Sequence, residues 1–474
     1  MTTLIATLVC LAGILGLFWL DRDSKGKTSI MLWLPSIWFF LACSRSIARW
    51  FNIGTTSVND QMMEGSPIDK AVLGAFVVAG LVILYQRWAK VSSILRQCLP
   101  IILYFGYCLA SLLWSDFPDV GFRRWTKAIG DWVMILIVFT DPQPSLALRR
   151  LLTRVGYTAI PLSVLYAKYY PMLGRAYGRW SGAISYIGIT TDKNTLGALC
   201  MLLGLASVWQ LYQLFGKEAP RRHRAGKVVV HVAILAMVFW LFAVLDSMTS
   251  LSCFVLTSGL VLSLQLKIYR RIPFLVHAVI VGMVGLTAAI AFLGLSPAAL
   301  HAMGRNSSLT ERTDIWAEVI KLVPNVWLGT GYESFWLGKR LDDMITNVTR
   351  WWVPNQSHNG YLEIWANLGW VGIVLLACVL VWGYGRVIQQ WRRKTEGSDL
   401  MLAYFVGGVI FNFTEAAFFR MMAPVWIFLL LALTSPAASL TRIGKNMAEA
   451  KTAKPKDCEI TEVGVLEGAV SIQV

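Results

Sequence analysis

The 474-residue sequence contains little charge. Charged side chains make up 15% of it, against about 25% in average soluble domains. A composition with so little charge argues against a set of soluble domains. The 56% hydrophobic content, with 21 tryptophans and 22 phenylalanines, is typical of a membrane protein whose aromatic residues lie at the bilayer interfaces. We therefore expect one membrane domain.

The sequence also lacks the common patterns for metals, disulfides and nucleotides. Its eight cysteines form no CxxC and no Cys/His set, which argues against a disulfide framework and a structural zinc. The carboxylates that fall on the outer side, in the membrane orientation predicted below, form no DxD pattern. We therefore predict no metal site and no cofactor. The glycines of "GTGYESFWLG" (329–338) lack the lysine and the strand context of a phosphate-binding loop and indicate a turn.

Long apolar runs are abundant instead. The N-terminus lacks the basic region and the cleavage site of a signal peptide, so its apolar run is predicted to be a retained span. Windows long enough to cross a bilayer predict an all-α transmembrane helical bundle of 12–13 spans. The candidate spans are 3–20, 29–43, 69–86, 99–114, 128–140, 152–170, 194–215, 228–246, 249–266, 272–294, 360–384, 400–418 and 423–440.

The net charge of +16 reflects 43 Lys and Arg residues against 27 Asp and Glu residues. The positions of the basic residues indicate what this charge is for. They form short clusters between apolar runs, as the positive-inside rule requires, and so indicate no nucleic-acid partner. The basic clusters alternate with less basic segments from one connection between spans to the next. This alternation predicts a periplasmic N-terminus and a cytoplasmic C-terminus in a bacterial inner membrane. We predict a membrane domain over 1–440, with a long outer loop at 295–359 inserted in it, and a disordered cytoplasmic tail over 441–474. Within that loop, "RTDIWAEVIKLV" is predicted to be helical up to Pro324.

His358 is the histidine most suited to chemistry. Of the five histidines, only His301 and His358 fall on the predicted outer side, and His358 alone lies in a polar, turn-forming run, "PNQSHNG", at the start of a span. Imidazole titrates near neutrality and can take a proton from a hydroxyl group. His358 is therefore a candidate general base. The alternative is an interfacial residue that caps the helix beginning at Gly360.

Outer-side cations form a second group. Arg305, Arg312, Arg179 and Lys193 lie in the predicted outer loops. Guanidinium groups bind phosphate oxygens in bidentate fashion, so these residues are candidate pyrophosphate ligands. The alternative is that each extends to lipid phosphates at the end of a helix.

The order of motifs in "RTDIW…VPNVWLGTGYESFW…SHNGYLEIWANLGWVG" resembles that of the O-antigen ligase/polymerase superfamily. "EGSPID", "LLWSDFPDVGFRRW" and "GITTDKNTLG" extend the similarity over about 60–435, and the set resembles the exopolysaccharide-production (Wzy-type) polymerases. The resemblance implies a GT-C-like membrane fold and a metal-independent, inverting glycosyltransferase. Its donor would be an undecaprenyl-pyrophosphate-linked oligosaccharide.

The resemblance also assigns roles to individual residues. His358 matches the essential histidine of the family and Arg312 the arginine of the outer-loop element, while Asn359 and Tyr361 belong to the same element as His358 and are predicted to contact substrate. Membrane lipids, a flippase and a chain-length regulator would be partners. One departure is Met248 in "DSMTSL", where many members have Arg or Lys. We hypothesise that Arg179 or Lys193 supplies this charge.

Three functions stay open at this point. The first is a polysaccharide polymerase, and the second is an O-antigen ligase that moves the glycan to lipid A core or another acceptor. The third is a polysaccharide transporter or flippase, for which functional polar residues at mid-membrane would be typical. Glu415 in "NFTEAAFF" is the main exception to a set of polar candidates that otherwise lies on one face. Glu415 could also lie at an outer helix end or line the substrate cavity.

Overall fold

The computed structural model describes residues 2–22, 26–53, 65–177, 184–215, 221–245, 247–293, 308–350 and 352–436. All of these residues belong to one compact unit, Met1–Pro436. The predicted tail, 441–474, lies outside the described residues. Helices dominate, and the one described sheet pairs two short antiparallel strands, β1 (Arg175–Tyr177) and β2 (Ile184–Tyr186).

The first half of the chain forms long helices joined by short connections. In order they are α1 (Thr3–Leu20), η1 (Ile30–Leu32), α2 (Trp33–Ala42), α3 (Ile47–Trp50), α5 (Pro67–Gln86), α6 (Trp88–Gln97), α7 (Leu99–Ala110), η2 (Ser111–Trp114), α8 (Pro118–Phe139), α9 (Pro144–Tyr169), α10 (Pro171–Gly174) and α11 (Lys193–Phe215).

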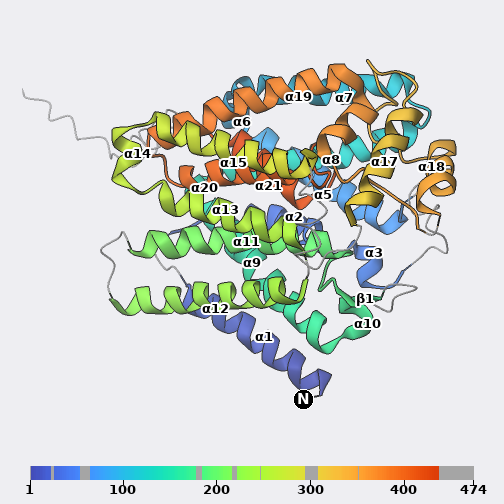
Figure 1. The fold of residues 1–474 in the computed structure, drawn as a ribbon. Helices are drawn as coiled ribbons and strands as arrows, with labels where there is room; N and C mark the ends of the chain where they lie inside the picture. The colour runs from blue at the N-terminus through green and yellow to red at the C-terminus, as the bar shows by residue number, and fades with distance from the viewer. Residues whose placement is uncertain are drawn as a thin grey trace, which may run out of the picture. The chain divides into compact units, whose positions relative to one another are not determined.

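The second half contains the long outer loop between two such helices. Its elements are α12 (Arg221–Leu245), α13 (Met248–Ser263), α14 (Lys267–Arg271), α15 (Phe274–Leu293), α17 (Ser308–Leu322), α18 (Lys339–Met344), η3 (Ile345–Thr349), α19 (Gly360–Arg392), α20 (Ser398–Phe411) and α21 (Pro424–Thr434). The long helices α11, α12, α13, α15 and α19 lie side by side, and the short elements α3, α10, β1, α17 and α18 gather at one end (Figure 1).

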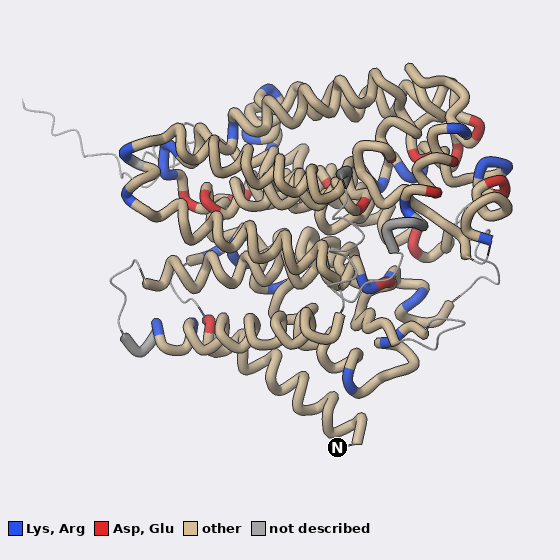
Figure 2. Tube along the Cα trace, viewed as in Figure 1, with Lys and Arg blue, Asp and Glu red and all other residues tan. Residues whose placement is uncertain are grey.

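This architecture confirms the predicted class, a polytopic helical membrane protein. Among the described helices, α1, α5, α11, α12, α15 and α19 are long and apolar enough to cross a membrane, and the bent pair α6 and α7–η2 would add a seventh. Charged residues gather toward the two ends of the bundle (Figure 2). The higher predicted count depends on α8, α9 and four shorter apolar helices. A helix of 10–16 residues is only about 15–24 Å long, less than a bilayer core of about 30 Å.

Two of the shorter apolar helices, α20 and α21, form the centre of the bundle. Every residue of α21 is buried, as are nearly all residues of α20. These two helices pack against each other, and α20 also packs against α13 and α19. By contrast, α1 exposes a row of large apolar side chains, including Leu4, Leu8 and Leu15, as expected for a helix that faces lipid. Because α20 and α21 are central, the connection between them lies at the middle of one end of the bundle.

One predicted span ends earlier than its hydropathy suggests. The run 400–418 was expected to be one helix, but α20 ends at Phe411. The Asn412 side chain accepts hydrogen bonds from the backbone N–H groups of Ala417 and Phe418, at 2.8 and 3.0 Å. These bonds fold the next residues into a compact turn, which places Glu415 in a loop.

The helix α19 is broken at Gly369, where φ is +64°. The loop 326–331 fills the break, because Gly331 N–H donates to Asn367 O and Trp370 N–H donates to Val326 O. Backbone groups freed inside a membrane protein need such internal partners. A Cβ at residue 369 would lie 2.2 Å from the backbone of Trp327, so the close crossing requires glycine. The glycine-rich stretch predicted to be a turn thus joins the outer loop to α19.

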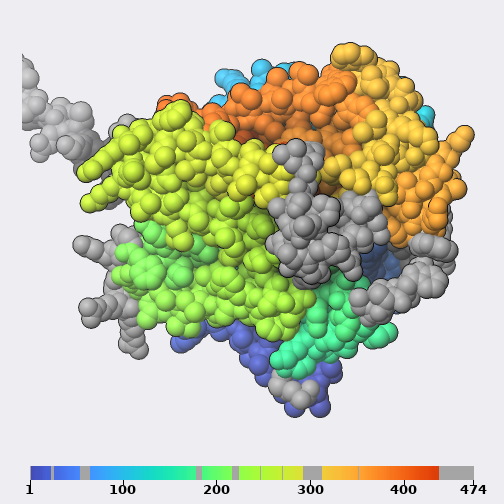
Figure 3. All heavy atoms as spheres, in the orientation of Figure 1, coloured from blue at the N-terminus to red at the C-terminus, as the bar shows by residue number. Residues whose placement is uncertain are grey.

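The outer loop has a small hydrophobic core of its own. Ile315 and Val319 of α17 pack with Phe335, Trp336 and Met344. The face in Figure 3 places this gold-to-orange segment beside the yellow-green helices α13 and α15. The predicted helix in "RTDIWAEVIKLV" is confirmed as α17, which ends two residues before Pro324. A packed core gives the loop the rigidity needed to position side chains.

Candidate functional site

His358 lies in a tightly held turn before α19. Its backbone φ is +54°, a conformation uncommon in residues other than glycine and found most often where the surroundings impose it. The neighbouring Ser357 is buried. Its N–H donates to Glu363 Oε2 at 2.8 Å, and its carbonyl accepts from Trp316 Nε1 at 2.8 Å. The outer loop and α19 together therefore fix the direction of the imidazole.

The residues after His358 begin the helix. The Asn359 side chain caps α19 by accepting from the N–H groups of Tyr361 and Leu362 at 3.0 and 3.2 Å, as asparagine commonly does at this position. Gly360 donates its N–H to Asn412 O at 2.7 Å. A Cβ at residue 360 would lie 2.0 Å from Asn412 Oδ1. The "HNG" sequence is thus what allows His358 to lie against the α20–α21 connection.

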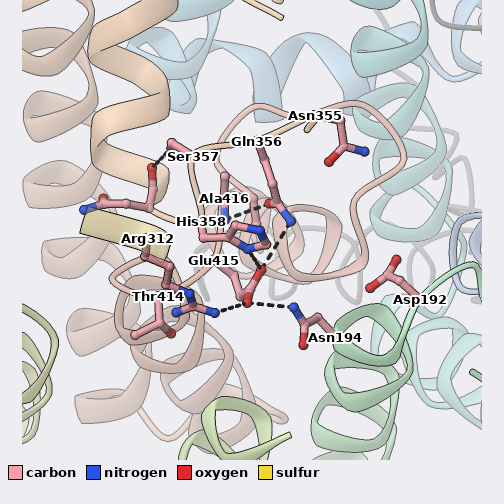
Figure 4. Close-up of polar contacts among 12 residues, drawn as sticks. Asp192, Asn194, Arg312, Asn355, Gln356, Ser357, His358, Thr414, Glu415 and Ala416 are labelled. Atoms are coloured by element: carbon pink, nitrogen blue, oxygen red, sulfur yellow. Dashed lines mark hydrogen bonds and ion pairs between the residues drawn. The ribbon is translucent and has the colours of Figure 1, made fainter. Parts of the chain in front are cut away.

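Glu415 of that connection is the centre of a polar cluster (Figure 4). Its Oε2 lies 3.0 Å from His358 Nδ1 and accepts from Gln356 Nε2 at 3.3 Å. Its Oε1 accepts from Asn194 Nδ2 at 2.8 Å and from Arg312 at 3.0 Å. The Glu415 side chain is only 5% exposed. Four segments that are distant in the sequence therefore meet at one buried carboxylate.

This arrangement determines the tautomer of the imidazole. An ionised carboxylate can only accept hydrogen bonds, so His358 Nδ1 must carry the proton that lies between it and Glu415. In a neutral ring the other nitrogen, Nε2, then has the free lone pair. Within the described part of the chain, Nε2 makes no hydrogen bond of its own. A carboxylate-oriented imidazole with a free Nε2 is the arrangement that general bases use.

Arg420 and Gln356 extend the cluster. Gln356 Oε1 accepts from Ala416 N–H at 3.2 Å and from Arg420 at 3.3 Å, and a second Arg420 nitrogen donates to Asn355 O at 3.0 Å. These acceptors are neutral, so none of them neutralises the charge of Arg420. The structure gives Arg420 no salt bridge to a described carboxylate.

Tyr332 of the outer loop contacts the same connection. Its hydroxyl donates to Phe419 O at 2.6 Å, next to Arg420. Burial raises the pKa of Tyr332 well above its ordinary value of 10, because the phenolate would lose its hydration. The hydroxyl thus stays protonated and keeps its donor role.

A cavity of about 580 Å³, lined by Gln356, His358, Glu415 and Arg420 among other residues, lies beside the cluster, and its size suits a small-molecule ligand. Its polar lining includes residues of α5, α8, the start of α11, the segment before α19 and the α20–α21 connection, and Trp352 adds a half-exposed aromatic ring. The charged and polar lining residues include Asp69, Lys127, Asp192, Asn194, Gln356, His358, Glu415 and Arg420.

The structure brings together some of the predicted site residues and not others. His358 lines the cavity, and Arg312 reaches it through Glu415 without lining it. Tyr361 packs against Phe413, with ring centroids 5.0 Å apart, and like Asn359 it does not line the cavity. Lys193 begins α11 between the lining residues Asp192 and Asn194 but is not itself part of the lining. Arg179 and Arg305 lie outside the described residues, so their predicted roles stay predictions.

Several members of the cluster were not predicted from the sequence as site residues. Asn194, Gln356 and Arg420 have no distinguishing local pattern. Glu415 did have a signal, since it is a carboxylate within an apolar run. Among the described residues, no group of three or more His, Cys, Asp or Glu side chains could hold a metal ion.

Comparisons with known proteins give two matches. Residues 183–377, which include α11, the outer loop and the first part of α19, match the family model described as O-Antigen ligase. The chain is also 24% identical over 345 residues to the exopolysaccharide production protein ExoQ of Rhizobium meliloti (strain 1021). That alignment covers 68% of this chain and 73% of the relative. Both similarities, with a polytopic helical fold, support the resemblance of the chain to the O-antigen ligase/polymerase superfamily.

Proposed function

We propose that this protein is a polysaccharide polymerase. It would join glycan repeat units carried on undecaprenyl pyrophosphate, with His358 as the general base. The observation that carries the proposal is the 3.0 Å contact between His358 Nδ1 and the buried Glu415 carboxylate at the wall of a large cavity. This contact leaves Nε2 free to take a proton.

The reaction needs one bond to form and one to break. An acceptor hydroxyl oxygen attacks the anomeric carbon of the donor, and the bond from that carbon to the pyrophosphate oxygen breaks. The hydroxyl proton passes to His358 Nε2, and the polyprenyl pyrophosphate leaves with the electron pair. A positioned base typically contributes about 10²–10⁴-fold to such a step. The resemblance to the family implies inversion at the anomeric carbon and no metal.

Fixed cations would stabilise the leaving pyrophosphate. Arg420 and Lys127 line the cavity, and neither forms a salt bridge with a described carboxylate. Cations held in a partly dehydrated site stabilise developing negative charge far better than they do in water. Arg312 is already paired with Glu415, so its first task is to hold that carboxylate. Its remaining N–H groups could also contact the pyrophosphate.

The cavity is proposed to face the periplasm, at the outer leaflet of a bacterial inner membrane. The distribution of charge supports this orientation, because basic residues such as Lys267, Arg271, Arg392 and Arg393 lie on the connections at the other end of the helices. Positively charged connections are typical of the cytoplasmic side. This orientation puts the N-terminus in the periplasm and the C-terminus in the cytoplasm. A flippase and a chain-length regulator would then act beside this protein.

An O-antigen ligase is the second candidate, and the description of the matching family model favours it. A ligase and a polymerase share the donor chemistry and differ in the acceptor. The relative in Rhizobium meliloti is an exopolysaccharide production protein, which favours a polymerase.

A single assay separates the candidates. Right-side-out and inverted membrane vesicles containing the protein are given a short-chain polyprenyl-pyrophosphate oligosaccharide, with lipid A core and excess chelator present. We expect longer lipid-linked chains, formed only in right-side-out vesicles. Transfer to lipid A core alone would identify a ligase, and products confined to inverted vesicles would refute the proposed orientation.

A further inference from the structure

A second cavity lies at the opposite end of the bundle from His358. It has a volume of about 330 Å³ and is bordered by α1, α2, α9, α11 and α12. Gln210 of α11 lines it, whereas Asn194 of the same helix lines the first cavity. Sixteen residues of α-helix separate these two positions, which corresponds to about 24 Å. The second cavity is therefore separate from the proposed catalytic site.

The lining of this cavity is strongly basic. Three arginines come from one face of α9, and two further cations come from the end of α1 and from α12. These residues are Arg22, Arg149, Arg150, Arg154 and Lys227, and Asp21 is the one described carboxylate among the lining residues. The Asp21 carboxylate lies 3.8 Å from Lys227 Nζ and accepts from the Tyr157 hydroxyl at 2.9 Å. The cavity thus keeps a large excess of positive charge.

Neutral groups hold Arg150 and Arg154 in place, whereas Arg149 lies 4.0 Å from the carboxylate of the exposed Glu396. Arg150 donates to Thr28 Oγ1 at 2.7 Å. Arg154 donates to Ser36 Oγ at 3.3 Å, and its guanidinium carbon lies 4.0 Å from the centre of the Trp33 ring. A guanidinium group has five N–H donors in a fixed fork. These contacts position the arginines and leave donors for an anionic ligand.

Two buried polar atoms at the cavity have no partner among the described residues. They are His231 Nδ1 and Arg149 Nε. The His231 side chain is only 2% exposed, yet it lines the cavity. A buried polar group without a hydrogen bond is costly and uncommon in folded proteins. The pair therefore points to a ligand that brings hydrogen-bonding oxygens into the cavity.

We propose that this cavity binds the phosphate head group of an anionic phospholipid. The apolar side chains of Phe18, Trp33, Leu146 and Leu214 share the lining with the arginines. Trp33 is half exposed, as expected for an aromatic residue at a bilayer interface. Basic pockets between transmembrane helices are suited to doubly charged head groups such as that of cardiolipin. A ligand with phosphates and acyl chains would match both parts of the lining.

Native mass spectrometry of the full-length protein in detergent tests the proposal. Tetraoleoyl cardiolipin is added as the probe, with dioleoylphosphatidylcholine and inorganic pyrophosphate in parallel samples. We expect cardiolipin to be retained at least tenfold better than phosphatidylcholine. The double substitution Arg149→Gln and Arg154→Gln should weaken cardiolipin binding about 30-fold, because each basic residue near an anionic head group contributes roughly fivefold in affinity.

Two matched variants separate a bound head group from general charge or misfolding. Arg149→Lys with Arg154→Lys keeps the charge and should retain most of the binding. Lys267→Gln with Arg271→Gln removes two exposed cations of α14 and should change binding less than threefold. Equal binding by the Arg149/Arg154 glutamine variant and the native protein would overturn the proposal. Strong binding of pyrophosphate without retention of cardiolipin would also overturn it, in favour of a soluble anion.

Discussion

Replacing Glu415 by glutamine is expected to lower the rate of glycan transfer about 10³-fold. In the native protein, Arg312 and Asn194 donate to one carboxylate oxygen, and His358 and Gln356 approach the other. Glutamine must place its NH₂ group at one of these two positions. Facing the Arg312 cation would be repulsive, so the NH₂ group should turn toward His358. Nδ1 would then become an acceptor, and the proton would move to Nε2, which removes the base.

The kinetic pattern distinguishes this effect from a general loss of structure. The maximal rate should fall while the KM for the lipid-linked donor stays within about threefold, because Glu415 acts through His358 and not on the donor. Asp343→Asn in α18 is the matched control, since Asp343 is at the same end of the bundle but outside the cavity. A Glu415→Gln protein with near-native rate, at normal expression, would show that Glu415 does not position the base.

Replacing Arg312 by glutamine should lower the rate about 10²-fold, and most of this loss should disappear in a Glu415→Gln background. The Arg312–Glu415 pair is largely buried, at 3.0 Å, and removing one partner of such a pair leaves the other without compensation. If Arg312 acts mainly by holding Glu415, the two substitutions will be strongly non-additive in a double-mutant cycle. Additive losses would instead mean that Arg312 binds the pyrophosphate directly.

Arg420→Gln provides the comparison within the same cycle. Arg420 lines the cavity and contacts neutral acceptors, so its loss should mainly raise the KM for the donor, by about tenfold or more. That loss should add to the effect of Glu415→Gln. An unchanged KM would remove Arg420 from the proposed pyrophosphate site.

The membrane fold was largely predictable because a bilayer demands long apolar segments. The ends of the helices were less predictable where a helix includes polar residues outside its apolar run. The helices α8 and α9 begin near Pro118 and Pro144, well before the apolar runs inside them, because proline suits the first turn of a helix. Hydropathy also could not locate the end of α20, since Phe413, Ala416 and Phe418 continue the apolar run. The side-chain bonds of Asn412 end the helix there.

The site was predictable only where a residue type by itself suggested chemistry. His358 and Arg312 could be selected by their position in the outer segments and by resemblance to the family. Glu415 could be noticed as an unusual carboxylate, but its partners could not be identified. Asn194 is 221 residues away in the sequence and Arg312 is 103 residues away, and the folding of four segments brings them together.

The residues next to His358 were selected from the sequence, but their contacts in the structure are within the protein. Asn359 and Tyr361 belong to the same motif and were predicted to contact substrate. In the structure Asn359 caps α19 and Tyr361 packs against Phe413 and Phe418. Their predicted contact with substrate stays a prediction. A short motif can combine a residue that lines a cavity with residues that hold the backbone, and sequence alone does not separate the two groups.

The most direct test is a single-turnover measurement of elongation by purified protein in lipid nanodiscs, comparing the native protein with His358→Gln. A defined undecaprenyl-pyrophosphate oligosaccharide serves as donor and acceptor, and bound donor is quantified before the products are resolved. We expect both proteins to bind the donor to the same extent, with longer lipid-linked chains formed by the native protein alone. Chain growth by the His358→Gln protein at a rate near that of the native protein would contradict a base at this position.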